Sequence, residues 1–231
     1  MRDEGHHAED ERRVVDGQTE TGSASGGSAF AGSIPVAVDN AGAPSGLSSA
    51  SSLLLSSIEI ERRAERVKLL LMDCDGVLTD GRITLLGEDD EQKSFHTRDG
   101  HGLVMLHRAG IKSGIISGRT SSAVVHRARD LGITYLRQGT WEKVKDFTEV
   151  LAEARVAAED VAYIGDDVTD IPLMRRCGLC VAVADATDDT RAAADFVTRL
   201  PGGFGAVREV CELILKAQRR WDDLMKRYTE E

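Results

Sequence analysis

Short apolar runs alternate with amphipathic stretches along most of this chain, from Val67 onward. The apolar runs have the length of buried strands, and the stretches between them have the 3.6-residue period of helices. Strands that alternate with helices form a parallel sheet, because each helix carries the chain back across one face of it. The sequence therefore predicts an α/β fold, a doubly wound parallel sheet with helices on both faces.

The positions of the elements follow from this pattern. A pair of apolar segments at 83–87 and 93–97, separated by acidic residues, predicts a β-hairpin insertion. Asp99 is expected to cap the helix that follows the hairpin. The predicted strands are residues 67–73, 111–117, 133–136, 160–166, 179–185 and 196–200. The predicted helices are residues 100–110, 121–132, 141–156, 170–178, 190–195 and 206–228.

Residues 1–57 differ in composition from the rest of the chain. They are rich in Gly, Ser and Ala and contain few large apolar side chains. Such a segment buries too little apolar surface to offset the entropy lost on ordering. We therefore predict a disordered extension over residues 1–57, with a short helix starting near Ser57. Residues 58–231 are predicted to form one domain, which carries the function.

The charge of the chain argues against two classes of partner. The formal net charge is −10 over 231 residues, so neither nucleic acid nor an anionic membrane is expected as a partner. No apolar run approaches the roughly 20 residues of a membrane-spanning helix. The first residues are charged rather than apolar, so no secretory signal is expected. The prediction is a cytoplasmic protein.

Polar side chains gather where the predicted strands end. Asp73 and Asp75 follow the first strand. Because residues two apart in an extended chain face the same way, they can share one site. The other strands bring further groups to the same edge of the sheet, which is where ligands of such sheets bind. These groups are Ser117, Gly118, Arg119, Lys143, Asp166, Asp167 and Asp170.

This set of side chains suits phosphoryl transfer. Crowded carboxylates repel one another unless a cation neutralises them, and Mg²⁺ prefers oxygen ligands while it also takes phosphate oxygens. Beside Mg²⁺, an aspartate can attack phosphorus, and Asp75 can exchange a proton with the leaving oxygen and with water. Lys143 supplies a fixed positive charge, and Ser117 a hydrogen bond to the phosphoryl group.

Four motifs on these residues resemble the haloacid dehalogenase superfamily of phosphotransferases. They are DCDGVLTDG at 73–81, IISGR at 115–119, Lys143, and GDDVTD at 165–170. They occur in the order and on the elements that the superfamily requires.

The resemblance implies a role for each acidic residue. Asp73 is the implied nucleophile and Asp75 the implied acid/base. The implied ligands of Mg²⁺ are Asp73, Asp166 and the backbone carbonyl of Asp75. Asp167 and Asp170 then lie behind these ligands and help to hold lysine and water.

Longer phrases between Val67 and Gln218 resemble one capless subgroup of that superfamily. These phrases include FHTRDGHGL, YIGDDVTDIPLM and GGFGAVREVCELILKAQ. The resemblance implies hydrolysis of 3-deoxy-D-manno-octulosonate 8-phosphate through an aspartyl-phosphate intermediate, in the synthesis of lipopolysaccharide precursors. It also implies a homotetramer without a cap domain. The chain between Asp75 and Ser117 has room for a hairpin and one helix only.

The open site needs further contacts to select its substrate. Gly118 and Arg119 lie at the rim and are predicted to bind the phosphorylated sugar acid, since arginine suits its anionic groups. Arg127 is a second candidate, with a solvated face or a structural ion pair as the alternative. The apolar hairpin edge is expected to pack against other copies of the chain. The glycine-rich segment at 202–206 could reach a neighbouring subunit's site.

Three other functions share features with this sequence. A nine-carbon sialic-type sugar acid 9-phosphate is the alternative substrate for the same chemistry. A catalytically idle, oligomerising domain is the alternative without chemistry, although all four motifs are intact. A phospho-accepting receiver domain carries its phosphorylated aspartate on the third strand, and residues 133–138 contain no aspartate.

Overall fold

The computed structural model describes residues 56–87 and 91–230. The predicted disordered extension lies outside the described residues, apart from Ser56 and Ser57. The helix expected near Ser57 is present as α1, Ser57–Arg66, and the Ser56 hydroxyl accepts a hydrogen bond from the Glu59 amide at its first turn. Within the described ranges, no helix is long and apolar enough to cross a membrane.

Six parallel strands form the central sheet, in the order β5-β4-β1-β6-β7-β8. All six predicted strands are present, although each is shorter than its apolar run. The strands are β1 Leu69–Met72, β4 Lys112–Ile116, β5 Tyr135–Arg137, β6 Val161–Gly165, β7 Leu179–Ala182 and β8 Phe196–Val197. The chain builds outward from β1 to β5 and then returns to β6 on the other side of β1. The sheet thus has a topological switch point beside β1, where doubly wound sheets bind ligands.

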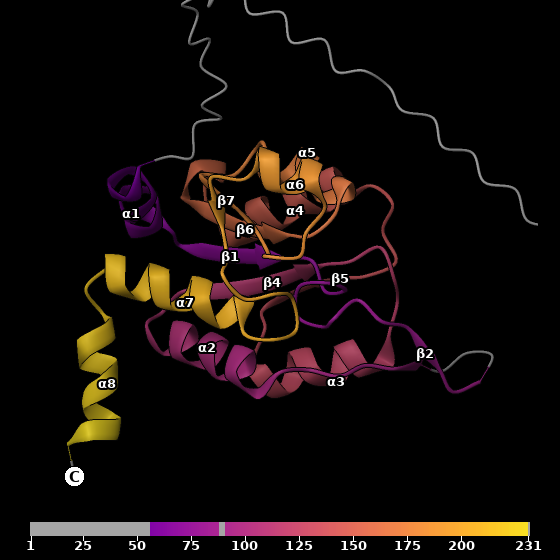
Figure 1. Ribbon diagram of the computed structural model, residues 1–231, viewed down its shortest axis with the longest axis horizontal. Helices are drawn as coiled ribbons and strands as arrows, with labels where there is room; N and C mark the ends of the chain where they lie inside the picture. Colours follow the sequence, from indigo (N-terminus) through magenta and orange to yellow (C-terminus); the bar gives the residue numbers. More distant parts are fainter. Residues whose placement is uncertain (1–55, 88–90, 231) are drawn as a thin grey trace, which may run out of the picture. The chain divides into compact units, whose positions relative to one another are not determined.

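Helices cover both faces of the sheet, as predicted (Figure 1). One layer contains α4 (Lys143–Ala154), α5 (Ile171–Met174) and α6 (Asp188–Ala193). The other contains α2 (Thr97–Arg108), α3 (Ser122–Leu131) and α7 (Ala206–Ala217), and α1 packs against α7. Short 3-10 turns lie at Ala158–Asp160 and Val168–Asp170.

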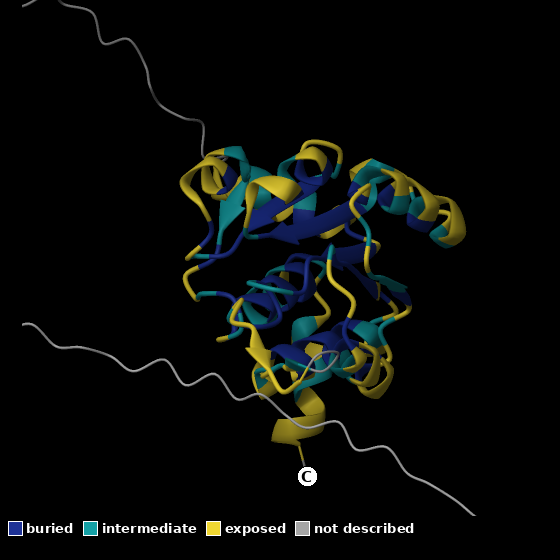
Figure 2. Cartoon of the chain, turned by 90° about the vertical axis from the view of Figure 1, so that its right-hand side faces the viewer, coloured by how far each residue is buried: buried dark blue, intermediate teal, exposed yellow. Residues whose placement is uncertain are grey.

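The hydrophobic core lies between these layers and the sheet (Figure 2). The four residues of β1 are fully buried, and most of β4 and all of β6 and β7 are buried as well. Central parallel strands are covered on both faces, which is why they are apolar throughout rather than alternating. The core therefore fixes the strands whose ends carry the predicted site residues.

The hairpin differs in detail from its prediction. It pairs β2, Thr84–Leu85, with β3, Glu91–Gln92, in an antiparallel ladder. The predicted return strand at 93–97 is not a strand, because His96 caps α2 and the helix begins at Thr97. The return segment is thus free to bring Lys93 toward the sheet.

The predicted C-terminal helix at 206–228 is two helices. Arg219 adopts a left-handed backbone, with φ of 56°, and separates α7 from α8, Trp221–Thr229. The Gln218 side chain donates to the Val67 carbonyl at 2.7 Å, and Arg220 donates to the Ala109 carbonyl. These contacts with distant loops hold the bend, although the sequence contains no glycine or proline there.

Asp99 does not cap α2 as predicted, because it caps α7 instead. Its buried carboxylate accepts hydrogen bonds from the amides of Gly205, at 3.0 Å, and Arg208, at 2.7 Å. The amides at a helix start have no partner within the helix, so a carboxylate there satisfies them and suits the helix dipole. One side chain therefore ties α2 to the start of α7.

We expect Asp99→Ala to lower the free energy of unfolding by about 2 kcal/mol, because two buried amides lose their acceptor. Urea unfolding measures this change. The matched control is Asp130→Ala, at an exposed position near the end of α3, which should shift stability by less than about 0.5 kcal/mol. Equal effects of the two substitutions would contradict the assigned cap.

Candidate active site

A pocket lies at the carboxyl ends of β1, β4 and β6, at the switch point of the sheet. It is lined by all the site residues predicted from the sequence except Arg127 and Asp170. Asp170 lies directly behind it, in contact with Lys143. The predicted constellation is therefore assembled in one place by three strand ends and the start of α4.

Asp73 and Lys143 form the centre of the pocket. Lys143 is the first residue of α4, and its Nζ donates to Asp73 Oδ2 at 2.6 Å and to Asp170 Oδ1 at 2.8 Å. The other oxygen of Asp73 accepts from the Cys74 amide at 2.6 Å. Burial acts to lower the pKa of Lys143, but the charges of Asp170 and Asp73 outweigh it and raise that pKa. Lys143 is therefore a fixed cation beside the predicted nucleophile.

Asp170 lies behind the pocket and holds both Lys143 and the loop after β6. Its Oδ1 also accepts from the Tyr163 hydroxyl at 2.8 Å, and its Oδ2 from the backbone amide of Asp166 at 3.1 Å. Both of its oxygens are engaged, and the residue is fully buried. Asp170 thus orients Lys143 and the loop after β6, in agreement with the supporting role implied by the resemblance.

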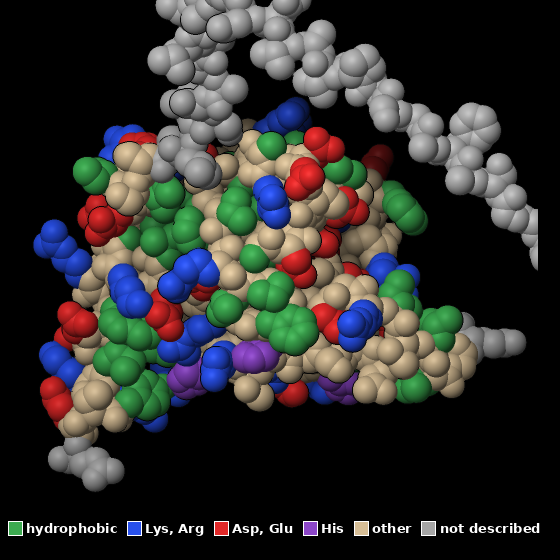
Figure 3. Space-filling model, in the orientation of Figure 1, with side chains coloured by type: hydrophobic (Ala, Val, Ile, Leu, Met, Phe, Trp, Pro, Cys, Tyr) green, Lys and Arg blue, Asp and Glu red, His purple; other side chains and the backbone are tan. Residues whose placement is uncertain are grey.

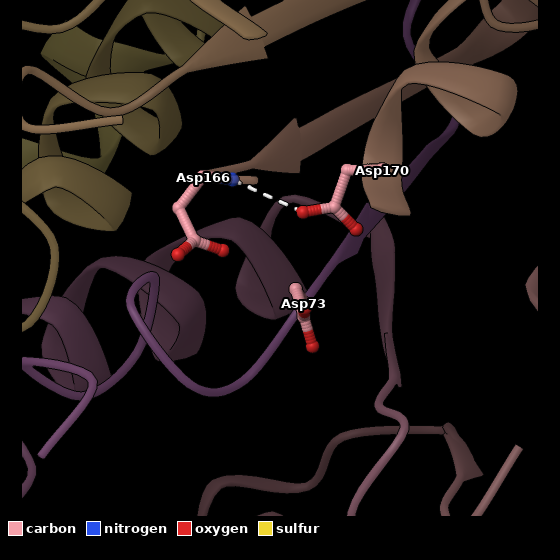
Figure 4. Close-up of side chains that lie close together, drawn as sticks. All are labelled: Asp73, Asp166 and Asp170. Carbon is pink, nitrogen blue, oxygen red and sulfur yellow. Dashed lines mark hydrogen bonds between the residues drawn. The ribbon is translucent and has the colours of Figure 1, made fainter. Parts of the chain in front are cut away.

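Asp166 completes the acidic cluster (Figure 4). One carboxylate oxygen each from Asp73, Asp166 and Asp170 lie within 4.8 Å of one another, close enough for one metal ion. Asp170 is fully buried behind the pocket, whereas Asp73 and Asp166 line it, so these two are the carboxylates that a metal ion in the pocket would contact. Glycine is required at position 76, since a β-carbon there would overlap the Asp166 carboxylate.

The crowding of these carboxylates changes their pKa values. Burial, with the charges of Asp170 and Asp73, raises the pKa of Asp166 to about 8. Burial and the charge of Asp170 likewise raise the pKa of Asp73 to about 6, although Lys143 opposes them. Carboxylates that resist ionisation where they stand are suited to a divalent cation, which removes the repulsion. The donor set therefore fits Mg²⁺.

Asp75 faces a different group of side chains. Its Oδ1 accepts an ion-paired hydrogen bond from Lys93, whose side chain is only 2% exposed. Its Oδ2 lies 3.8 Å from Arg119 Nε. Glu91 of β3 links the two cations, at 3.2 Å from Lys93 and 2.6 Å from Arg119. The hairpin thus supplies a lysine that holds the predicted acid/base.

Sequence reasoning missed Lys93 and Glu91. The hairpin was predicted as an apolar insertion that packs against other copies of the chain, so its charged residues were not assigned to the site. The signal that could have found them is the alternation of Glu91, Gln92 and Lys93, which puts two charged side chains on one face of an extended segment.

The loop after β4 forms the opposite wall. Ser117 is buried, and its hydroxyl accepts from the Arg119 amide at 3.3 Å. Gly118 and Arg119 line the pocket with it, as predicted. The helix predicted over residues 121–132 begins at Ser122, so Thr120 belongs to the loop.

Arg127 is not brought to this pocket. Its guanidinium lies over the Phe95 ring, 5.7 Å from the ring centre, and against Gly100 of α2. The two helices α2 and α3 therefore hold Arg127 at their junction. Contact with substrate remains a prediction for Arg127.

The glycine-rich segment packs within its own chain. The Gly203 amide donates to the Val77 carbonyl at 2.9 Å, and a β-carbon at Gly202 would overlap the Gly76 carbonyl. The Gly202 amide also donates to Asp185 at 2.9 Å. In the described chain this segment supports the turn that follows Asp75, so its predicted reach into a neighbouring subunit stays a prediction.

Comparison with known proteins agrees with this geometry. Residues 135–202 match the family model of haloacid dehalogenase-like hydrolases. The chain is 45% identical, over 167 residues, to the 3-deoxy-D-manno-octulosonate 8-phosphate phosphatase KdsC of Escherichia coli K12. This match covers 72% of the chain and 89% of the relative.

Solved structures give the same result. The phosphatase of that name from Moraxella catarrhalis, in complex with magnesium, phosphate and the sugar acid, matches with a TM-score of 0.72 and 41% identity, over 74% of this chain and 99% of that one. The cobalt-bound enzyme from Haemophilus influenzae matches with a TM-score of 0.65 and 42% identity, over 68% of this chain and 92% of that one.

The chain therefore belongs to the haloacid dehalogenase-like hydrolases, in the family of the 3-deoxy-D-manno-octulosonate 8-phosphate phosphatases.

The receiver alternative fails because β5 carries no aspartate and the acidic groups meet at β1 and β6. An idle domain has no need of a buried lysine held between two carboxylates, and here Lys143 is held in this way. In the described ranges, the hairpin and α2 are the elements between β1 and β4, so no cap domain lies there.

We expect Mg²⁺ binding to release protons, because Asp166 and Asp73 hold them in the metal-free protein. Between pH 8 and pH 6, the dissociation constant for Mg²⁺ should rise about tenfold for each unit of pH lost. Calorimetric titration at pH 6, 7 and 8, in buffers of different ionisation enthalpy, measures both quantities. Asp166→Asn should abolish most of the release at pH 7, and an unchanged release would count against this cluster as the metal site.

The same pKa values predict a pH-dependent stability. The pKa values of Asp73 and Asp166 in the folded protein lie above the value of about 4 that these groups have in an unfolded chain. The metal-free protein therefore loses stability as pH rises from about 4 to 8. Mg²⁺ should offset this loss, and it should raise the Tm more at pH 8 than at pH 6. Differential scanning calorimetry with and without Mg²⁺ tests the sign.

We expect Lys93→Met to lower kcat by about 10- to 100-fold, because Asp75 loses the cation that holds it for proton transfer. Phosphate release at saturating substrate measures the effect. The control is Lys112→Met, at the opposite end of the sheet, which should keep kcat within about twofold. A fully active Lys93→Met enzyme would remove Lys93 from the reaction.

Proposed function

We propose that the chain hydrolyses 3-deoxy-D-manno-octulosonate 8-phosphate to the free sugar acid and inorganic phosphate. The observation that carries this proposal is the match to the Escherichia coli phosphatase with that substrate. The two chains are 45% identical, and the match covers 89% of the relative. The pocket supports it, because Asp73, Asp75, Ser117 and Lys143 lie together around the acidic cluster. The reaction is that of a phosphoric monoester hydrolase.

The reaction proceeds in two displacements. In the first, the Asp73 carboxylate attacks phosphorus, and the bond from phosphorus to the C8 oxygen of the sugar breaks as Asp75 protonates that oxygen. In the second, Asp75 takes a proton from water, whose oxygen attacks the aspartyl phosphate and releases phosphate. Asp73 leaves the cycle as a free carboxylate, and Asp75 returns to its protonated state.

Other residues stabilise charge during these steps. Lys143 lies 2.6 Å from Asp73, where it offsets the charge on the phosphoryl oxygens. Ser117 donates a hydrogen bond to the phosphoryl group from the loop after β4. Asp73, Asp166 and the Asp75 carbonyl are proposed to hold Mg²⁺, which neutralises phosphate and carboxylate charge when bound.

Arg119 and Gly118 are proposed to bind the rest of the substrate. The Arg119 side chain is 45% exposed at the pocket rim, and its Nη2 already holds a carboxylate, that of Glu91. Because the Arg119 guanidinium pairs with the carboxylate of Glu91 at this position, it is also suited to bind the carboxylate of a sugar acid. Gly118 leaves space at the rim, since a β-carbon there would meet only the Thr140 carbonyl, at 3.5 Å.

Phosphate release tests this function directly. With Mg²⁺, we expect the protein to prefer 3-deoxy-D-manno-octulosonate 8-phosphate over a nine-carbon sialic-type 9-phosphate and over simple hexose phosphates. Asp73→Asn should lower kcat by several orders of magnitude, since the covalent step is lost. EDTA should abolish turnover, and added Mg²⁺ should restore it.

Each failure of this experiment has a distinct meaning. A preference for the nine-carbon substrate would correct the substrate but keep the reaction. Equal turnover of all sugar phosphates would leave only a general phosphatase. Full activity in Asp73→Asn would exclude the aspartyl-phosphate route.

We further propose that the chain forms a homotetramer through the hairpin. Ile83, Leu85 and Leu86 are 50–70% exposed there, and hydrophobic side chains lie at the surface around this end of the molecule (Figure 3). Exposed apolar clusters of this kind favour contact with another protein surface. Light scattering should give a molar mass of about four chains for the wild-type protein and a lower mass for Leu85→Glu. A monomeric wild-type protein at micromolar concentration would overturn this proposal.

The cellular setting is also a proposal. Four free cysteines support a reducing compartment, the cytoplasm, where the product would enter lipopolysaccharide synthesis.

We place the catalytic unit in residues 58–231, together with the cap at Ser56. A chain that lacks residues 1–55 should keep its kcat/KM, and loss of activity would move this boundary.

A further inference from the structure

Trp141 is an unusual residue of the pocket. Its side chain is 94% exposed, the most of any large hydrophobic residue in the described chain. It is also the sole aromatic residue among the described side chains that line the pocket. Tryptophan is usually well buried, because its indole offers a large apolar surface. An indole held in water at a pocket mouth therefore calls for an occupant.

The backbone around Trp141 is held in place. Trp141 lies in the loop between β5 and α4, two residues before Lys143. The Gly139 amide donates to the Arg119 carbonyl at 3.2 Å, and the Gln138 side chain accepts from the Ser121 amide at 2.8 Å. The Glu142 amide donates to the Thr140 hydroxyl at 3.1 Å. The loop is thus joined to the loop that carries Ser117 and Arg119.

The indole itself has no ring partner. The aromatic and cation–π contacts of the described residues do not include it. Trp221, the other tryptophan, lies instead beneath Lys216 and Arg208, with ring distances of 4.8 and 5.4 Å. Trp141 can therefore gain a contact without breaking one.

The chemistry of the pocket indicates what the indole contacts. The phosphoryl group is bound at the floor by Asp73, Ser117 and Lys143, so the carbon chain of the substrate extends toward the mouth. Besides Trp141, the apolar side chains of the lining are Val144, Pro172 and Leu173, so the indole is its one flat apolar surface among the described residues. An aromatic face carries negative charge density, which suits the C–H groups of a sugar.

We propose that Trp141 is a specificity-determining residue whose indole packs against the carbon chain of the sugar acid. The inference rests on the proposed function and deepens it. Trp141 supplies one wall of a pocket that has no cap, and it distinguishes a long sugar acid phosphate from a small phosphate ester. Its contact is made in the bound substrate and the transition state alike, so it lowers KM rather than raising kcat.

Steady-state kinetics with Mg²⁺ tests this role. For 3-deoxy-D-manno-octulosonate 8-phosphate, Trp141→Ala should raise KM about tenfold and change kcat by less than about twofold. The preference for this substrate over a small phosphate ester, glycerol 3-phosphate, expressed as a ratio of kcat/KM values, should fall about tenfold. Trp141→Phe should restore much of it. The control Tyr228→Ala removes an exposed aromatic residue from α8 and should leave the ratio unchanged.

Fluorescence gives a second readout. Trp221→Phe leaves Trp141 as the single tryptophan, and Asp73→Asn in the same chain prevents turnover. The sugar acid phosphate should shift the emission to shorter wavelength and protect the indole from acrylamide, whereas inorganic phosphate alone should do neither. An indole already protected in the ligand-free protein would show that another copy of the chain covers it, which overturns the proposal.

The two proposals fail in different ways. A wild-type enzyme that does not release phosphate from the sugar acid phosphate refutes the proposed function, and this inference with it. A wild-type enzyme that is active, with an unchanged preference in Trp141→Ala, refutes the role of Trp141 alone.

Discussion

The site depends on one buried cation between two carboxylates. Lys143 begins α4, where the helix dipole disfavours a positive charge. It stays there because Asp73 from β1 and Asp170 from the turn after β6 both bond it. Removing either carboxylate would leave a buried charge without its partner, which is costly. This contact therefore joins β1, β6 and α4 at the point where the phosphoryl group is proposed to bind.

Two acidic groups with different surroundings follow from this arrangement. Asp73 lies in the cluster with Asp166, where burial and repulsion raise the pKa values and favour a metal ion. Asp75, two residues on, lies against Lys93 of the hairpin. The proposed nucleophile and the proposed acid/base thus have different neighbours, although they are only two residues apart in the chain. The glycine-rich segment at 202–206, held by Asp99, supports the turn that follows Asp75.

Much of this arrangement could be predicted from the sequence, because local patterns determine it. Apolar runs indicated the six strands, and the four motifs indicated Asp73, Ser117 and Asp166 at strand ends and Lys143 near the start of the following helix. The missed features depend on distant contacts. Asp99 caps a helix that starts over 100 residues later, and the bend at Arg219 is held by loops elsewhere in the chain. Lys93 was missed because its role depends on where the hairpin ends.

The split of the C-terminal helix has a practical consequence. Since α8 turns away from α7 and buries no residue of its own, the chain ends on the outside of the domain. That end lies at the opposite side of the molecule from the strand tips of the sheet (Figure 1). A fluorescent protein or a surface tether joined there would leave the entrance to the pocket clear, so the molecule is suited to immobilisation by its tail.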